Sequence, residues 1–136
     1  ANNLIVSGNN IVNNGYFNAG NNLTLNSTNL TNNKTLFSGN DMNLYTTNTL
    51  NNTENANIFA MNNLIMAKNS SNGKTSSITN DKATIQTYNG NMSIYANNFR
   101  NTTDDPIIKE IYDHSGDVKT WTEDATRYKE AKLSSG

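Results

Sequence analysis

A short motif that recurs along the first three quarters of the chain constrains the fold more than any other feature. In most copies a pair of asparagines precedes an apolar triplet, as Asn21–Asn22 precedes Leu23–Leu25. The first apolar residues of the copies are Leu4, Leu23, Met42, Leu64 and Met92, with spacings of 19, 19, 22 and 28 residues. Self-similarity at such a period is typical of repeat architectures and is read before any other signal.

Three further positions keep a fixed distance from these markers. The residues two places after the marker are Val6, Leu25, Leu44, Met66 and Ile94. Seven or eight places after the marker stand Ile11, Leu30, Leu50 and Phe99, each followed two places later by an asparagine, whereas Ser71 takes this place in the fourth unit. A second short segment precedes three of the markers by six places, with Phe17, Leu36 and Ile58 each followed two places later by Ala19, Ser38 or Ala60.

These patterns predict short strands with one apolar and one polar face. Such strands cannot enclose a core within one unit, but stacking buries the apolar face and pairs each strand with its copies. The predicted fold is therefore all-β, a parallel β-helix of about five coils. The longest insertion, between Lys68 and Thr87, contains turn-forming Ser-Ser-Asn-Gly and Thr-Asn-Asp sequences and is expected to leave the rod as a loop.

The asparagines have two expected roles at the corners of such a rod. All thirty lie within the first 101 residues. Asparagine tolerates left-handed backbone angles, and its amide can both donate and accept hydrogen bonds along a stack of identical residues. The alternative, a disordered asparagine-rich tract, leaves the apolar spacing unexplained.

Composition changes after Asn101, which divides the chain into a repeat region, 1–101, and a charged segment, 102–136. The second segment has no asparagine and thirteen of the 21 charged residues. We expect it to cap the last coil or to begin the next region. Strands at Ile108–Asp113 and Val118–Thr122 form a hairpin in one interpretation. In the other, a helix capped by Asp105 begins at Pro106 and ends near Gly116. Glu123–Leu133 is predicted as a short helix.

Charge and hydropathy exclude several classes of function. The formal net charge is −1, which indicates no nucleic-acid partner, and no apolar run approaches 18 residues, so no membrane insertion is expected. There is no cysteine, hence no disulfide and no cysteine–zinc site. The chain opens in the middle of a repeat without a signal peptide, which favours a segment of a longer protein.

The units Gly20–Asn33 and Gly39–Asn52 resemble the haemagglutinin repeats of filamentous haemagglutinins, loosely Gly-x-x-Leu-x-Leu-x-Ala-x-x-Leu-x-Asn, and Asn91–Asn101 matches the same pattern. The same repeats build the stalks of contact-dependent growth-inhibition effectors of the CdiA type. Both groups are exoproteins of Gram-negative two-partner secretion systems. The resemblance covers residues 1–101, whereas 102–136 match no known motif.

The resemblance implies a right-handed β-helix that is secreted to the bacterial cell surface through an outer-membrane partner transporter, which recognises an N-terminal region that this chain lacks. It implies a structural shaft that projects a distal adhesin, receptor-binding or toxin region. The alternative is that the segment itself is a receptor- or glycan-binding module that contacts a target cell.

No catalytic, cofactor-binding or metal-binding site is predicted, and we expect no enzymatic activity. The single histidine, His114, lies in an expected turn, and the carboxylate pairs Asp104/Asp105 and Asp113/Asp117 are typical of a solvated face. β-helical polysaccharide lyases and glycosidases cluster charged residues on consecutive coils, but the repeat region holds only Asp41, Glu54 and Asp81 as acids.

Aromatic residues are the remaining candidates for partner contact. Trp121 and Tyr128, in the charged segment, are the predicted partner-binding residues, and the other expected role of Trp121 is to close the segment onto the last coil. Outward tyrosines of the repeats could stack on a glycan or a receptor, or form aromatic ladders between coils.

Overall fold

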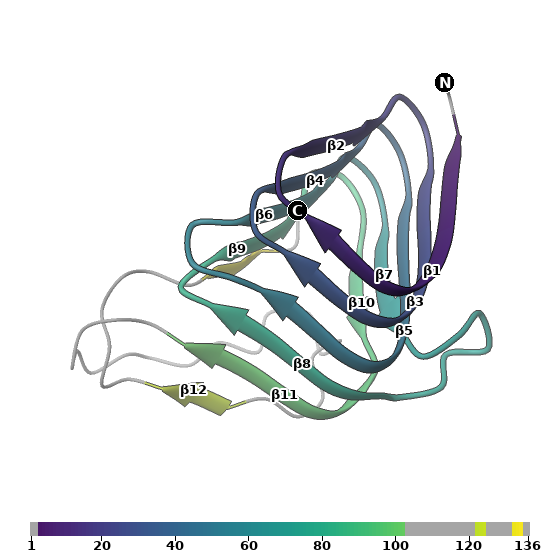
Figure 1. The fold of residues 1–136 in the computed structure, drawn as a ribbon. Coiled ribbons are helices and arrows are strands. Elements are labelled where there is room, and N and C mark those ends of the chain that lie inside the picture. Colours follow the sequence, from purple (N-terminus) through teal and green to yellow (C-terminus); the bar gives the residue numbers. More distant parts are fainter. Residues whose placement is uncertain (1–2, 103–121, 125–131, 135–136) are drawn as a thin grey trace.

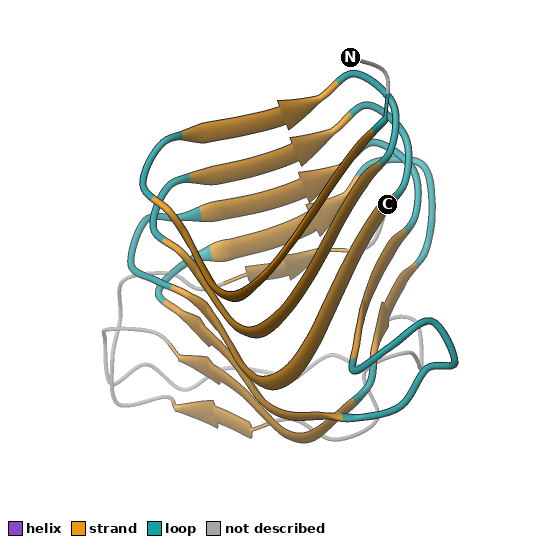
Figure 2. Cartoon of the chain, turned by 45° about the vertical axis from the view of Figure 1, so that its right-hand side comes forward, coloured by secondary structure: helices purple, strands orange, loops and turns teal. Residues whose placement is uncertain are grey.

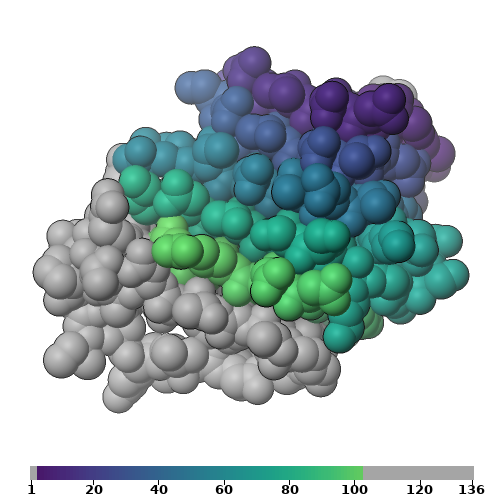
Figure 3. Space-filling view, turned by 60° about the horizontal axis from the view of Figure 1, so that its bottom comes forward, coloured from purple at the N-terminus to yellow at the C-terminus, as the bar shows by residue number. Residues whose placement is uncertain are grey.

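A computed structural model describes residues 3–102, 122–124 and 132–134, and these residues form thirteen strands and no helix. The strands follow one another around a rod in successive coils, and every pairing between them is parallel (Figure 1). About five coils stack along the axis, and Figure 3 shows them as bands that run in chain order from purple to green. The predicted parallel β-helix is confirmed.

Two sheets make up the sides of the rod. The first, of eight strands, contains β1 (Leu4–Asn13), β3 (Leu23–Asn32), β5 (Met42–Asn52), β7 (Leu64–Ala67), β8 (Thr75–Asp81), β10 (Met92–Ile94), β11 (Ala96–Thr102) and β12 (Thr122–Asp124). The second, of five strands, contains β2 (Tyr16–Ala19), β4 (Thr35–Ser38), β6 (Asn57–Ala60), β9 (Thr84–Thr87) and β13 (Lys132–Ser134). Strands β1, β3 and β5 bend midway, so the first sheet covers two sides of the rod and the second covers the third (Figure 2).

The strand register places equivalent residues of successive coils directly above one another. The marker residues form one continuous column through Leu4, Leu23, Met42, Leu64 and Met92. A second column runs through Val6, Leu25, Leu44, Met66 and Ile94. Members of both columns from the second coil onward are at most 4% exposed, so the alternating apolar face that the sequence predicts is the core of the rod.

The fourth coil corrects the prediction made for Ser71. The apolar position of this coil is Ile78, which aligns with Leu50 and Phe99 and is fully buried. The residues that leave the rod are 68–74 only, because Thr75–Asp81 and Thr84–Thr87 are strands β8 and β9. The insertion displaces the repeat pattern by seven residues along the sequence, and this displacement puts Ser71 at the place where an apolar residue is expected.

A buried column of asparagines, which we call the inner ladder, runs through Asn13, Asn32, Asn52, Asn80 and Asn101. Each side-chain nitrogen Nδ2 donates to the Oδ1 of the next coil, over distances of 2.8, 2.9, 2.8 and 2.9 Å. The second hydrogen of each Nδ2 reaches a backbone oxygen beside the second sheet, for example Thr84 O at 3.0 Å from Asn52. The inner ladder therefore ties the end of the first sheet to the start of the second.

The asparagine pairs before the apolar triplets form a second column, the outer ladder, made of Asn3, Asn22, Asp41, Asn63 and Asn91. In the outer ladder each Oδ1 accepts from the backbone of the next coil, as Asn22 Oδ1 does from Asp41 N at 3.1 Å. The first member of each pair adds its Nδ2, as Asn40 does to the same oxygen at 3.0 Å. The paired asparagines of the motif thus connect consecutive coils by hydrogen bonds.

Left-handed backbone angles explain few of the asparagine positions. Among the described non-glycine residues, only Asn55, Asn72 and Lys82 have positive φ values. The ladder asparagines keep ordinary backbone angles, so the predicted axial hydrogen bonding, and not the left-handed conformation, accounts for their positions.

The described parts of the charged segment are strands. Strand β12 pairs with β11, and β13 pairs with β9, so both sheets gain a strand beyond the repeat region. The helix predicted over Glu123–Leu133 is wrong at both ends, because 123–124 and 132–133 belong to these strands. Residues 125–131, and the predicted hairpin up to Trp121, lie outside the described residues.

Candidate functional surface

The predicted partner-binding residues Trp121 and Tyr128 lie outside the described residues, as do His114 and the carboxylate pairs Asp104/Asp105 and Asp113/Asp117. The described surface is almost entirely that of the repeat region. Among the described residues there is no helix of the length and hydrophobicity that crossing a bilayer requires. The same residues contain no cluster of three or more histidine and carboxylate side chains that could hold a metal ion.

The three acidic residues within 3–102 each have a structural partner. Asp41 Oδ1 accepts from Asn62 Nδ2 at 2.8 Å and from Asn63 N at 3.1 Å as part of the outer ladder. Asp81 Oδ1 accepts from the Thr102 hydroxyl at 2.7 Å. The carboxylate of Glu54 lies 3.8 Å from the ammonium of Lys82. Asp41 lies just before β5, whereas Glu54, after β5, and Asp81, at the end of β8, lie at one corner of adjacent coils, and each of the three carboxylates is engaged in a contact within the rod.

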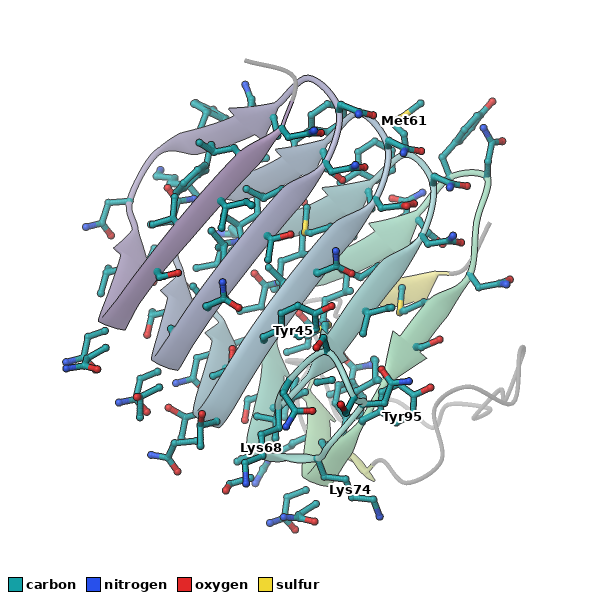
Figure 4. All side chains as sticks on the ribbon, turned by 90° about the vertical axis from the view of Figure 1, so that its right-hand side faces the viewer. Tyr45, Met61, Lys68, Lys74 and Tyr95 are labelled. Atoms are coloured by element: carbon teal, nitrogen blue, oxygen red, sulfur yellow. The ribbon has the colours of Figure 1, made fainter. Side chains whose placement is uncertain are left out.

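Outward aromatic residues follow two patterns. On the second sheet Phe37 and Phe59 occupy equivalent places in adjacent coils, and their ring centroids lie 5.6 Å apart, which confirms an aromatic contact between coils. Tyr16, in β2 of the same sheet, is 79% exposed, and Tyr88, directly after β9, is 57% exposed. Tyr45 instead stands on the first sheet, half-buried beside loop 68–74 (Figure 4).

Tyr45 lines a groove of about 750 Å³ on the outer face of the first sheet. The floor comes from three coils and includes Ser7, Asn26 and Tyr45, which are aligned in the strand register. Lys68, Asn69 and Ser70 of the loop form the opposite side. The groove therefore spans four consecutive coils and runs along the rod.

Loop 68–74 is held in shape by its own hydrogen bonds. Asn69 Oδ1 accepts from the backbone nitrogens of Ser71 and Gly73 at 3.0 and 3.1 Å. Its base is closed by a bond from Lys68 N to Gly73 O at 2.7 Å, and Asn72 takes a left-handed φ of 63° between them. The loop is thus a preformed wall of the groove.

The groove lining is polar but carries little charge. Its described lining residues supply hydroxyl and amide side chains, the ring of Tyr45, the exposed side chain of Ile5 and one cation, Lys68, and include no aspartate or glutamate. Ser27, also in the lining, has a buried hydroxyl oxygen without a hydrogen-bond partner among the described residues. This oxygen is shielded from solvent, and Ser27 lies in register with the fully buried Thr46, so the oxygen is not accessible to a ligand in the groove.

The sequence contains only part of the signal for this surface. It predicts a loop after Lys68, and it predicts outward tyrosines as candidates for stacking. It does not predict that the loop lies beside Tyr45, because that placement depends on which way the insertion leaves the coil.

Comparisons with known proteins give no family for this chain: no family model matches it, and neither a curated protein nor a solved structure does.

Proposed function

We propose that the chain is a shaft segment of a secreted, surface-displayed exoprotein of a Gram-negative two-partner secretion system. In this proposal the rod holds a distal adhesin, receptor-binding or toxin region away from the cell. An outer-membrane partner transporter exports the protein, and the coils fold outside. The haemagglutinin-like repeats in Gly20–Asn33 and Gly39–Asn52 support the proposed relationship to filamentous haemagglutinins and growth-inhibition effectors.

The observation that carries the shaft proposal is the continuity of the residue columns from coil to coil, which a one-residue register shift between β3 and β5 does not interrupt. The columns from Leu4 to Met92 and from Asn13 to Asn101 continue through all five coils, even across the insertion at 68–74. Each coil is stabilised by its neighbours alone, so coils can be added without a change to the existing ones. This property suits a spacer, because the length of the rod can change by whole coils while its structure stays the same.

The chemistry of the repeat region supports a non-enzymatic role. Asp41, Glu54 and Asp81 are engaged in contacts that hold the coils together, so none of them is poised as a nucleophile or a general base. We therefore propose that the segment acts through its shape and its surface.

Duplication of one coil tests the shaft directly. A second copy of residues 20–38, inserted after Ser38, should stack in register and lengthen the rod by about 4.8 Å, the spacing between strands. Small-angle scattering should show the longer particle, and its unfolding free energy should not fall. A shuffled insert of the same 19 residues is the control, and equal behaviour of the two inserts would contradict the proposal.

A display experiment separates the shaft from a binding module. The chain is placed between an outer-membrane anchor and a peptide tag, and antibody access to the tag is measured on intact cells. The shaft proposal expects access to fall with Leu44→Asp, which puts a charge into the core, and to stay with Trp121→Ala and Tyr128→Ala. Loss of target-cell binding in the last two variants, with tag access retained, would instead assign partner binding to the charged segment.

A further inference from the structure

We propose that the groove between the first sheet and loop 68–74 binds a linear acidic oligosaccharide, one that carries carboxylate or sulfate groups. This inference does not depend on the proposed role as a shaft, because the groove is formed by side chains on the outer face of the first sheet, whereas the shaft proposal concerns the stacking of the coils. It adds a lateral binding site to a segment whose repeats serve another purpose.

The shape of the groove favours a chain-like ligand. Its lining comes from four consecutive coils, so it extends over about three strand spacings, or about 14 Å. Its volume of about 750 Å³ lies within the range of about 300–1,000 Å³ that is typical of ligand sites. A globular partner would need a broad contact surface, whereas a short linear oligomer can lie along the groove.

The lining favours a sugar. Tyr45 offers a half-buried ring face, on which the C–H side of a pyranose ring can stack, and Ile5, which is 69% exposed, offers a second apolar contact. Hydroxyls and amides around them, including Ser7, Asn26 and Asn69, can donate to and accept from sugar hydroxyls.

The charge of the groove favours an acidic sugar. Lys68 lines it, Lys74 stands at the other end of the same loop, and Figure 4 shows both on the face that carries Tyr45. Within the part of the chain that the structure describes, no carboxylate lines the groove beside Lys68. One lining cation is too few for a nucleic acid, which requires several phosphate contacts, but it can select an anionic sugar over a neutral one.

The rigid loop lowers the cost of binding. Asn69 fixes the loop through its bonds to Ser71 and Gly73, and the pairing of β1, β3 and β5 fixes the floor. Little conformational freedom is left to lose when a ligand binds.

The test uses the full chain, labelled with nitrogen-15, and three tetrasaccharides. They are a hyaluronan fragment with carboxylates only, a chondroitin sulfate fragment with both carboxylates and sulfates, and neutral chitotetraose. We expect backbone resonances of Ser7, Asn26, Tyr45 and Asn69 to shift with an acidic fragment, with weaker or no shifts for chitotetraose. Comparison of the two acidic fragments identifies the preferred anion.

Matched variants locate the site. Lys68→Glu should weaken binding about tenfold, the effect of one lost charge-assisted hydrogen bond, and Lys68→Arg should retain it. Lys34→Glu makes the same charge change outside the groove and should have little effect. Tyr45→Ser should weaken binding, whereas Tyr88→Ser, at an exposed tyrosine directly after β9 of the other sheet, should not.

Four results would overturn the proposal. They are equal affinity for chitotetraose and the acidic fragments, no shifts in the groove residues with any fragment, equal losses in Lys68→Glu and Lys34→Glu, and full binding by Tyr45→Ser. Tyr45 and Lys68 point away from the core, so the amide spectrum of each variant should otherwise match that of the parent chain.

Discussion

The inner and outer ladders place the same kind of side chain in two different surroundings. The inner-ladder residues are at most 8% exposed, and each amide uses both its oxygen and its nitrogen within the protein. In the outer ladder the side-chain oxygen is the part that binds the next coil, and most of its bonds lie at or near solvent. The inner positions therefore require an amide, whereas the outer positions require only an acceptor.

Asp41 shows that the outer ladder accepts a carboxylate. Its Oδ1 makes the same two bonds as Asn22 Oδ1 does one coil earlier, one to a backbone nitrogen and one to an amide nitrogen. A carboxylate at an inner position would instead face Oδ1 of the next coil and a backbone oxygen, with no hydrogen to donate. The two ladders differ in their tolerance of a carboxylate because the outer ladder uses only the side-chain oxygen as an acceptor, whereas the inner ladder also uses the side-chain nitrogen as a donor.

Asn52→Asp should have the largest effect. The new carboxylate would replace the donor to Asn80 Oδ1 and to Thr84 O in a fully buried position. We expect a loss of about 3–5 kcal/mol in the free energy of unfolding, the cost of an unpaired buried charge. Urea unfolding followed by circular dichroism measures it, and a loss below about 1 kcal/mol would show that the inner ladder is not selective for amides.

Gly90→Ala tests how tightly the outer ladder is packed. A Cβ at residue 90 would lie 2.3 Å from Asn63 Oδ1 and 2.5 Å from the Asn62 carbonyl carbon. Part of the obstruction is backbone, so we expect a loss of about 1–3 kcal/mol, as for overpacked sites. Hydrogen exchange should show reduced protection at Asn91, whose backbone nitrogen donates to Asn63 Oδ1 at 2.9 Å.

Gly15→Ala is the matched control for Gly90→Ala. Gly15 also lies in a turn between coils, but no atom within 4 Å would meet its Cβ. It should be neutral or slightly stabilising, because alanine restricts the unfolded chain. Equal losses in the two variants would attribute the effect to the backbone and not to the collision.

The same contrast shows how far the sequence determines this fold. The sequence predicts the columns at Leu23 and Leu25 and the inner ladder through Asn13, Asn32 and Asn52. Residues that align in successive coils are separated by one repeat length, so the spacing in the sequence reveals the alignment. Asn80 could not be assigned before the insertion was placed, although Ile78 and Asn80 keep the same two-residue separation as Leu30 and Asn32.

The groove could not be predicted for a different reason. The turn-forming residues after Lys68 predict a loop. Its position beside Tyr45 depends on the direction in which it leaves the coil, and the spacing of residues in the sequence does not determine that direction. The sequence shows the outer ladder only as asparagine pairs. Each side-chain oxygen binds a backbone nitrogen of the next coil, and any residue except proline supplies that nitrogen, so no second residue type marks the contact.

Asn22→Ala measures what an outer-ladder oxygen contributes. The change removes acceptors from Asn40 Nδ2 and Asp41 N, both of which lie near solvent and can bind water instead. We expect a loss of about 0.5–1.5 kcal/mol, the net value of an ordinary hydrogen bond. Asn32→Ala, the buried counterpart in the same coil, should cost at least twice as much in the same urea titration.

Asp41→Asn should have the smallest effect of the series, and it tests the acceptor requirement alone. The asparagine oxygen can keep both bonds, to Asn62 Nδ2 and to Asn63 N, while the negative charge is lost. The expected change in unfolding free energy is within about 0.5 kcal/mol, because charge–dipole contacts at an exposed corner contribute little. A loss comparable to that of Asn22→Ala would mean that the charge of Asp41, and not its position as an acceptor, holds this corner. The two ladders would then differ in electrostatics as well as in burial.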